Sequence, residues 1–136
     1  MPIFKRKSHT RQPDLYLGPL PIQVINRTLG TDFMSGEVLF TRAAQIHAER
    51  RHPEEYPLCL PHVGLVIRNP LYIGDDFKNH GKIELIARIP QIGGALLVAI
   101  NMEQEEEGTY HVCSMYPVSE GKVQKRKEKG YLLVAK

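Results

Sequence analysis

The sequence predicts an α+β domain in which N-terminal helices pack on one face of a four-stranded antiparallel sheet. Two observations carry this prediction. The first half of the chain holds short helix-like segments that end at glycine or proline, whereas apolar residues in the second half recur with the two-residue period of strands. Helices that precede strands along the chain are typical of α+β domains, in which the two kinds of element are segregated.

The helices are predicted from the signals at their ends. Gly30 ends the first helix, Thr41 caps the second at its N-terminus, and Pro53 marks the end of the second. The third helix ends before Pro70, because the residue that precedes a proline avoids the helical conformation. The predicted helices cover residues 21–30, 42–52 and 60–68, with a short extended piece at Glu37–Phe40.

The strands are predicted from alternating or continuous apolar residues. In the first strand Ile83, Leu85 and Ile89 alternate with Lys82 and Arg88, which is typical of a half-buried strand. The second is more uniformly apolar, as in the centre of a sheet, and the acidic residues 103–107 form the turn that follows it. The predicted strands are Lys82–Ile89, Gly93–Met102, Thr109–Pro117 and Gly130–Ala135.

The two-residue period assigns the side chains of the third strand to two faces. One face is predicted to carry Tyr110, Val112, Ser114 and Tyr116, and the other His111, Cys113 and Met115. If the polar face of the first strand belongs to the same surface as Ser114, a polar floor results, on which the second helix stands as a wall. This floor consists of Lys82, Glu84, Arg88, Ser114 and Tyr116.

Length and composition indicate a single globular domain. The 136 residues are 42% hydrophobic and 24% charged, which are ordinary values for a folded domain. No apolar run reaches the roughly 20 residues of a membrane span, and no signal-peptide core follows Met1. Cys59 and Cys113 lack the paired spacing of a disulfide scaffold or a zinc site. We therefore expect a soluble domain over residues 15–136, preceded by a flexible basic arm over residues 1–14.

The positive charge is concentrated near the two ends of the chain, although the formal net charge is only +3. A polyanion can bind such clusters, but a solvated charged loop is the commoner interpretation of each cluster alone. The N-terminal cluster comprises Lys5, Arg6, Lys7 and Arg11, and the C-terminal cluster comprises Lys122, Lys125, Arg126, Lys127 and Lys129.

The segment His47–Tyr56 concentrates proton-transfer and anion-binding side chains. It holds two histidines, two arginines and three carboxylates in ten residues. Imidazole exchanges protons near neutral pH, and guanidinium offers a planar donor fork that matches phosphate. His47 and Arg51, four residues apart, share one helix face. His52 lies about 140° from His47 on an ideal helix, so both imidazoles serve one site only if the helix unwinds at Arg51.

Three short motifs resemble the phage-type domains of the barnase, EndoU, colicin and RelE nuclease group. The resemblance covers roughly Leu17 to Ala135, and the helix motif, which reads His-Ile-x-x-Arg-His in that group, is the most specific. Ala48 departs from the usual isoleucine, and Ser114 replaces the commoner threonine but keeps the hydroxyl. The motifs are His47-x-x-x-Arg51-His52-Pro53, Asn69-Pro70-x-Tyr72-Ile73 and Ser114-x-Tyr116-Pro117.

The resemblance implies a metal-independent RNase that serves as a phage effector or as the tip of a bacterial toxin. It implies N-terminal helices and a four-stranded antiparallel sheet, in agreement with the prediction above. The expected site of action is the bacterial cytoplasm, which the domain reaches from within the cell or by delivery from outside. The expected partners are an RNA substrate and an acidic immunity or antitoxin protein; no cofactor or metal is expected.

RNA carries its own nucleophile, so its cleavage needs a base for the 2′-hydroxyl proton, an acid for the 5′-oxygen and cations for the phosphorane. Among the candidate residues, His47 is the leading base or acid and His52 the second proton carrier. The remaining roles fall to Arg51 and Arg88 as charge stabilisers, Ser114 as a hydrogen-bond donor, Tyr116 as a stacking or donor group, and Lys82 and Arg50 as substrate-binding cations. The products would be a 2′,3′-cyclic phosphate and a 5′-hydroxyl end.

Each candidate also has a structural interpretation. A histidine such as His52 at a helix C-terminus interacts favourably with the helix dipole, and Arg88 can simply pair with Glu84. His62, His80 and His111 are interpreted as structural, and no suitably spaced ligand completes a zinc site. A non-catalytic module that binds RNA or a host protein on the same fold is the alternative function, followed by a phage structural accessory.

Overall fold

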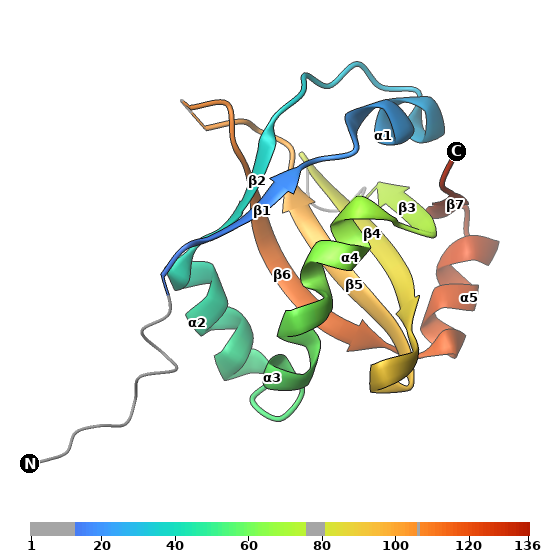
Figure 1. Ribbon diagram of the computed structural model, residues 1–136. Helices are drawn as coiled ribbons and strands as arrows, with labels where there is room; N and C mark the ends of the chain where they lie inside the picture. The colour runs from blue at the N-terminus through green and yellow to red at the C-terminus, as the bar shows by residue number, and fades with distance from the viewer. Residues whose placement is uncertain (1–12, 76–80, 106) are drawn as a thin grey trace, which may run out of the picture.

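The computed structural model describes residues 13–75, 81–105 and 107–136, and the predicted arm lies outside them up to residue 12. Within these residues, seven strands form one mixed sheet in the order β1-β2-β6-β5-β4-β3-β7, which Figure 1 shows with its helices. The strands are β1 (Leu15–Pro19), β2 (Glu37–Phe40), β3 (Tyr72–Asp75), β4 (Lys82–Ile89), β5 (Gly94–Asn101), β6 (Tyr110–Val118) and β7 (Leu132–Val134).

The helices do not all precede the sheet. Four of them lie between β1 and β3 in the chain, and the last follows β6. They are α1 (Ile22–Leu29), α2 (Arg42–Arg51), α3 (Tyr56–Cys59), α4 (Val63–Arg68) and α5 (Glu120–Glu128), with single 3₁₀ turns at Leu60–His62 and Pro90–Ile92. In the described part of the chain no helix is long and apolar enough to cross a membrane.

The prediction of four antiparallel strands behind N-terminal helices is therefore wrong, although the α+β class is correct. The sheet has seven strands, and β2 pairs with β6 in parallel. The missed strands β1 and β3 are short and contain Gly18 and Pro19 or Gly74, so they lack the apolar alternation that marks a strand. Helix α5 was missed because Val123 is its only buried residue.

The predicted end signals operate as expected on the first two helices. Gly30 has a φ of 69°, the left-handed conformation that glycine adopts without strain, and its N–H closes α1 on the carbonyl of Asn26. The Thr41 hydroxyl accepts the backbone N–H of Ala44 at 3.1 Å and caps α2. Helix α2 ends at Arg51, and His52 has a non-helical φ of −137°.

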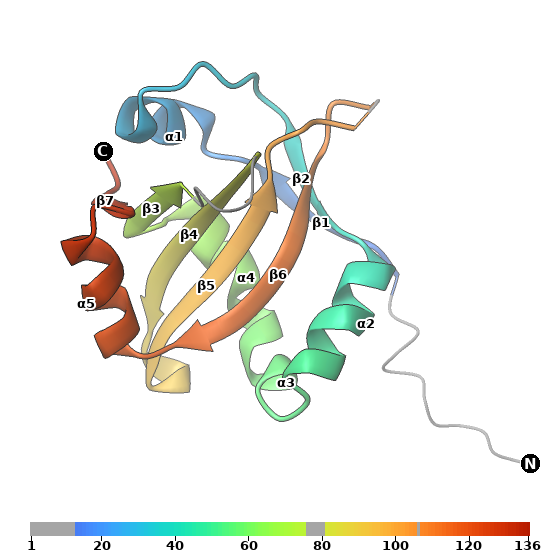
Figure 2. The ribbon, with the colours of Figure 1, turned by 180° about the vertical axis from the view of Figure 1, so that it is seen from behind.

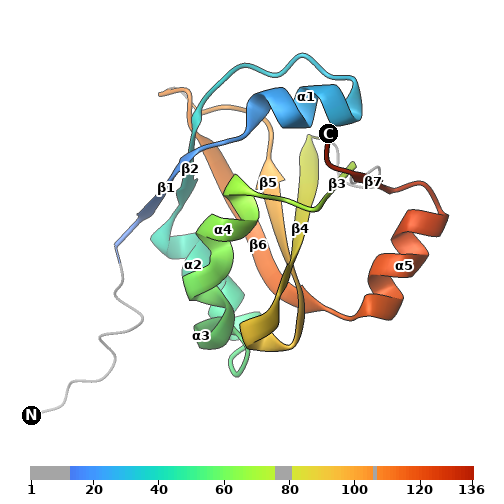
Figure 3. The same ribbon diagram turned by 45° about the vertical axis from the view of Figure 1, so that its right-hand side comes forward.

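The two faces of the central strands differ in their covering. We call the inner face the one that carries Leu85, Val98 and Met115, and there α1 and α4 pack on the main core. The outer face carries the side chains of Glu84, Ile86, Ala99, Ser114 and Tyr116, which the strand register places on one side. Figure 3 shows α4 and α5 on opposite sides of the sheet.

A β-bulge at Cys113 sets which β6 side chains reach the outer face. Ser114 is opposite Ala99 and Val112 is opposite Ile100, so Cys113 has no residue of β5 facing it. Val112 and Met115, three residues apart, therefore both reach the inner core. Ser114 and Tyr116 share the outer face as predicted, but the prediction that Tyr110 and Val112 accompany them is wrong, because the extra residue shifts the alternation.

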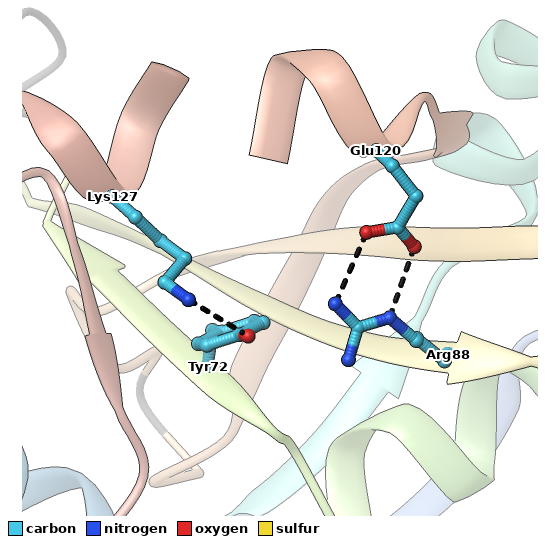
Figure 4. A network of polar contacts seen from close by, with 4 residues as sticks. All are labelled: Tyr72, Arg88, Glu120 and Lys127. Carbon is cyan, nitrogen blue, oxygen red and sulfur yellow. Dashed lines mark hydrogen bonds and ion pairs between the residues drawn. The ribbon is translucent and has the colours of Figure 1, made fainter. Parts of the chain in front are cut away.

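Helix α5 covers the side of the outer face that is formed by β3 and β4. Val123 packs there in a second apolar cluster with Tyr72, Ile86 and Leu97. Three polar contacts add to this packing: Glu120 pairs with Arg88, Lys127 donates to the hydroxyl of Tyr72 at 3.2 Å, and Arg126 pairs with Glu84. Figure 4 shows the first two contacts. The remainder of the outer face, toward β6, is where the candidate residues gather.

Candidate active site

Helix α2 takes the place of a strand beside β6. Strand β2 pairs only with Tyr110 and His111 at the start of β6, and beyond them α2 and α3 contact the strand. Figure 2 shows α2 on one side of the outer face and α5 on the other, with β4, β5 and β6 between them. The histidine motif therefore lies at an edge of the outer face.

A buried hydrogen-bond network fixes the rotation of α2. Gln45, 3% exposed, donates from its amide nitrogen to the carbonyls of Pro13 and Phe40 at 3.0 Å each. The Tyr56 hydroxyl of α3 donates to the Gln45 amide oxygen at 3.3 Å. Burial, and then the nearby Glu49 carboxylate, raise the pKa of Tyr56 to about 12. The flank of α2 that carries Gln45 and Glu49 therefore faces α3, which packs in the inner core.

His47 and Arg51 lie on the opposite flank of α2. Residues two apart are separated by about 200° on an ideal helix, so His47 opposes Gln45 and Arg51 opposes Glu49. Ala48, between these flanks, is buried against the rest of the molecule, whereas His47 and Arg51 are exposed, as is Arg50 one position before Arg51. An anion bound at this edge of the sheet can reach them.

His52 connects the helix motif with β6. The helix ends at Arg51, which is the unwinding that both imidazoles need to serve one site. The imidazole of His52 stacks on the Tyr116 ring with a centroid separation of 5.3 Å and an interplanar angle of 17°. Offset-stacked aromatic pairs of this kind contribute about 0.5–1.5 kcal/mol beyond the area they bury. The contact brings the end of α2 to the end of β6.

Ser114 and Tyr116 lie over a floor of apolar side chains. Tyr116 is opposite Leu97, which is fully buried, and Ser114 is opposite Ala99. Both β6 side chains are half-buried, so each keeps part of its surface in contact with solvent. The hydroxyls of Ser114 and Tyr116 and the ring of His52 therefore come together at a solvent-accessible part of the outer face.

Lys82 lies at the same end of the outer face as Ser114. The register runs from Lys82 through Asn101 to His111 across β4, β5 and β6. Burial raises the pKa of the Cys113 thiol, and the Lys82 ammonium acts in the opposite direction, which places this cation near the bulge. His111 was interpreted as structural, yet it shares this row. The bulge hid its position, because simple alternation assigns it to the face opposite Ser114.

Arg88 is engaged elsewhere. Its guanidinium makes two hydrogen bonds to the Glu120 carboxylate, at 2.9 and 3.0 Å, rather than pairing with Glu84. These bonds hold the pKa of Glu120 below its usual value. The hydrogen bond from Lys127, and then Arg88, lower the pKa of Tyr72. Arg88 is thus part of the attachment of α5, on the side of the outer face away from α2.

Within the described residues, no group of three or more histidine, cysteine, aspartate and glutamate side chains is arranged to hold a metal ion. The residues that the structure brings together are instead His52 with Tyr116, Ser114 on the same face, and His47 with Arg51 on the adjoining flank of α2. These groups can exchange protons, donate hydrogen bonds and neutralise an anion, which is the set of actions that phosphodiester cleavage needs.

The comparisons with known proteins agree with the three motifs. A family model described as phage-Barnase-EndoU-ColicinE5/D-RelE like nuclease3 matches residues 18–125, which include every candidate residue named above. Neither the curated proteins nor the solved structures yielded a significant match. The matched region covers most of the chain, and it confirms the resemblance. The chain belongs to the phage-Barnase-EndoU-ColicinE5/D-RelE like nuclease family, and its domain is a nuclease domain.

Proposed function

We propose that this nuclease is a metal-independent endoribonuclease that cleaves RNA through attack of a 2′-hydroxyl on the adjacent phosphate. The single observation that carries the proposal is the stacking of His52 on Tyr116, with Ser114 beside it on the same face. This contact places the imidazole of His52, which can carry a proton, beside the hydroxyl groups of Tyr116 and Ser114 on an accessible surface of the sheet. A 2′-hydroxyl nucleophile needs no activation beyond removal of its proton, which an imidazole can provide.

The two histidines supply the proton transfers. One imidazole, His47 or His52, takes the 2′-hydroxyl proton as the phosphorane forms, and the other gives a proton to the departing 5′-oxygen. The P–O5′ bond breaks, and the products are a 2′,3′-cyclic phosphate and a 5′-hydroxyl. Their positions at the end of α2 suit this division, because His47 lies on the helix flank whereas His52 lies beyond the helix end and contacts the β6 ring.

The arginines of α2 stabilise the negative charge of the phosphorane. Arg51 shares the flank of His47, and Arg50 is exposed next to it. Ser114 donates to a phosphate or ribose oxygen, and Lys82, on β4 at the same end of the outer face as Ser114, contacts the substrate. We no longer assign phosphorane stabilisation to Arg88, because Glu120 already takes two of its donors.

The proposal is tested with purified wild-type, His47→Ala and His52→Ala proteins, incubated with total bacterial RNA in EDTA. His62→Ala is the matched control, because it removes an imidazole from a different segment, the Leu60–His62 turn. We expect cleavage to 2′,3′-cyclic phosphate ends by the wild type and the control, and a loss of about 10²–10⁴-fold in rate for each site variant. Equal cleavage by all four proteins would refute the histidine roles, and binding without cleavage would indicate a non-catalytic RNA-binding module.

We further propose that the RNase acts in the bacterial cytoplasm as a phage effector or toxin, restrained by an acidic immunity protein. The phage-type family supports this role, and the exposed arginines of α2 suit an acidic partner. Induced expression of the wild-type chain is expected to arrest bacterial growth, whereas expression of the His47→Ala chain is not. Normal growth with the wild type would contradict the toxin role without bearing on cleavage in vitro.

A further inference from the structure

Helix α5 separates its charges onto two flanks. One stripe contains Lys122, Arg126 and Lys129, spaced by four and three residues, and the opposite stripe contains Glu120, Gln124 and Glu128, spaced by four. Such spacings place the members of each stripe on one side of a helix. Lys122 and Lys129 are exposed, and no described residue forms an ion pair with either ammonium. The two lysines therefore offer positive charge to a partner outside the chain.

The packing of α5 shows which flank faces the candidate site. Val123 points into the sheet, and the two flanks diverge from it. Lys127 lies on the acidic side of Val123 and contacts Tyr72 of β3, toward the edge of the sheet. Arg126 lies on the basic side and contacts Glu84 of β4. Because Glu84 shares its row with Ala99 and Ser114, the basic flank faces the part of the outer face that holds Ser114.

The basic flank of α5 and the end of α2, where His52 contacts Tyr116, thus border the same surface from opposite sides, and Figure 2 shows the two helices on either side of it. Strands β4, β5 and β6 lie between them. At about 4.8 Å per neighbouring strand, β4 and β6 are about 10 Å apart, a span that a few nucleotides bridge. A single strand of RNA that reaches both helices would cross Ser114 and Tyr116.

We propose that Lys122 and Lys129 bind the phosphate backbone of the RNA substrate on the side of the site remote from α2. This inference rests on the proposed RNase function, and it defines the substrate as a segment of several nucleotides rather than an isolated dinucleotide. Backbone contacts of this kind add affinity and register without reading sequence. Arg126 is already neutralised by Glu84, which leaves the two lysines as the phosphate ligands of this flank.

Charge substitutions matched in number test this inference. The test variant is Lys122→Gln with Lys129→Gln, and the control is Arg68→Gln with Lys136→Gln, which removes two exposed cations elsewhere. Arg68 is the last residue of α4, which lies on the side of the sheet opposite α5. The probe is a 2′-O-methyl RNA of about 12 nucleotides, within the range of single-strand sites, which cannot be cut because its 2′-oxygen carries no proton.

The test variant is expected to raise the Kd of the probe about tenfold at about 0.15 M salt and to reduce the slope of log Kd against log salt by about 1.4, or about 0.7 for each lost contact. The control is expected to shift both quantities much less. Cleavage of a dinucleotide by the test variant should match that of the wild type, because the two lysines lie outside the site of bond breaking.

The outcomes separate the inference from the function on which it rests. Equal Kd values and slopes for test and control variants would overturn the role of the basic flank, even if the wild type cleaves RNA. Absence of probe binding by the wild type would overturn the inference together with the RNA substrate. Probe binding with the expected slopes but no cleavage of unmodified RNA would support the basic flank and refute the RNase activity.

Discussion

Two aromatic rings, His52 and Tyr116, join helix α2 to strand β6. Tyr116→Phe keeps the stacked ring and removes only the hydroxyl, whereas Tyr116→Ala removes the platform that orients the imidazole. We expect kcat/KM for RNA cleavage to fall less than about tenfold in Tyr116→Phe and by about 10²-fold or more in Tyr116→Ala. The measurement is single-turnover cleavage of a defined RNA by the three proteins.

A general loss of folding must be separated from this effect. Loss of the ring contact is expected to lower the free energy of unfolding by only a few kcal/mol, so the Tyr116→Ala protein should remain folded in urea titrations at low denaturant. If Tyr116→Phe were as inactive as Tyr116→Ala, the hydroxyl and not the ring would carry the role, and the positioning of His52 by stacking would be wrong.

For individual residues, the sequence alone predicted several positions correctly. The spacing of His47 and Arg51 places them on one helix flank, and Pro53 signalled the break that frees His52. The partner of Arg88 was not predictable, because Glu120 lies 32 residues further along the chain and meets it only through the packing of α5. A polar strand residue has many possible partners, and the tertiary fold selects among them.

Helix α5 is held to the sheet partly by the ion pair between Arg88 and Glu120. Arg88 lowers the pKa of Glu120 in the folded state, so the pair stabilises the fold fully above the unfolded glutamate pKa of about 4.3. This contribution is lost as the pH falls through the lowered folded value. Urea unfolding should therefore show wild type more stable than Glu120→Gln at neutral pH, with a difference that shrinks below about pH 4.

Glu128→Gln serves as the control, because it removes a carboxylate from the same helix without changing the Arg88 pair. Its stability relative to wild type should lack the acid-dependent change. A difference between wild type and Glu120→Gln that stayed constant from neutral to acid pH would show that the pair contributes nothing through the ionised carboxylate.

Strand β6 shows what local patterns do and do not predict for an element. The two ends of β6 were predicted to within one residue. The prediction that Ser114 and Tyr116 share one face of the strand was also correct. The bulge at Cys113 was not foreseen, because an inserted residue leaves no mark in a sequence of alternating character. Its presence follows from the partner strand, where Ala99 and Ile100 are opposite residues two positions apart on β6.

The sheet depends on its last segment, although the family match ends at residue 125, inside α5. Strand β7 pairs with β3 and buries Leu132, and Lys136 donates its N–H to Thr28 of α1 at 2.8 Å. A chain ended after Lys125 loses these contacts and part of α5. We expect it to lack a cooperative urea transition, because the lost interactions are comparable with a total stability of about 5–15 kcal/mol.

Two point substitutions in the full chain measure how much β7 contributes to the free energy of unfolding. Leu132→Ala, at a 4% exposed position, should cost about 2–4 kcal/mol, whereas Leu133→Ala, at a 42% exposed position, should cost less than about 1 kcal/mol. A shortened chain that unfolded cooperatively, with a midpoint near that of the full chain, would show that β7 is dispensable.

The order of strands was the least predictable property of the whole molecule. Alternating or continuous apolar residues identified β4, β5, β6 and β7, but they did not reveal that β3 separates β4 from β7 or that β2 joins β6 in parallel. Strand order depends on which surfaces bury one another in three dimensions, and many arrangements satisfy the same local patterns. Among the helices of the inner face, α1 and α4 were predictable, because Gly30 and Pro70 mark their ends, whereas the four-residue helix α3 was not predicted.

The position of α2 along β6 has a consequence for self-association. An uncovered strand edge recruits strands from other copies of a protein, and covering it with a helix is one protection against aggregation. Among the residues that the structure describes, β6 has no strand neighbour on the β2 side beyond His111, and α2 and α3 contact the strand there. The helix that carries His47 therefore also protects the edge of β6 from pairing with strands of other copies of the protein.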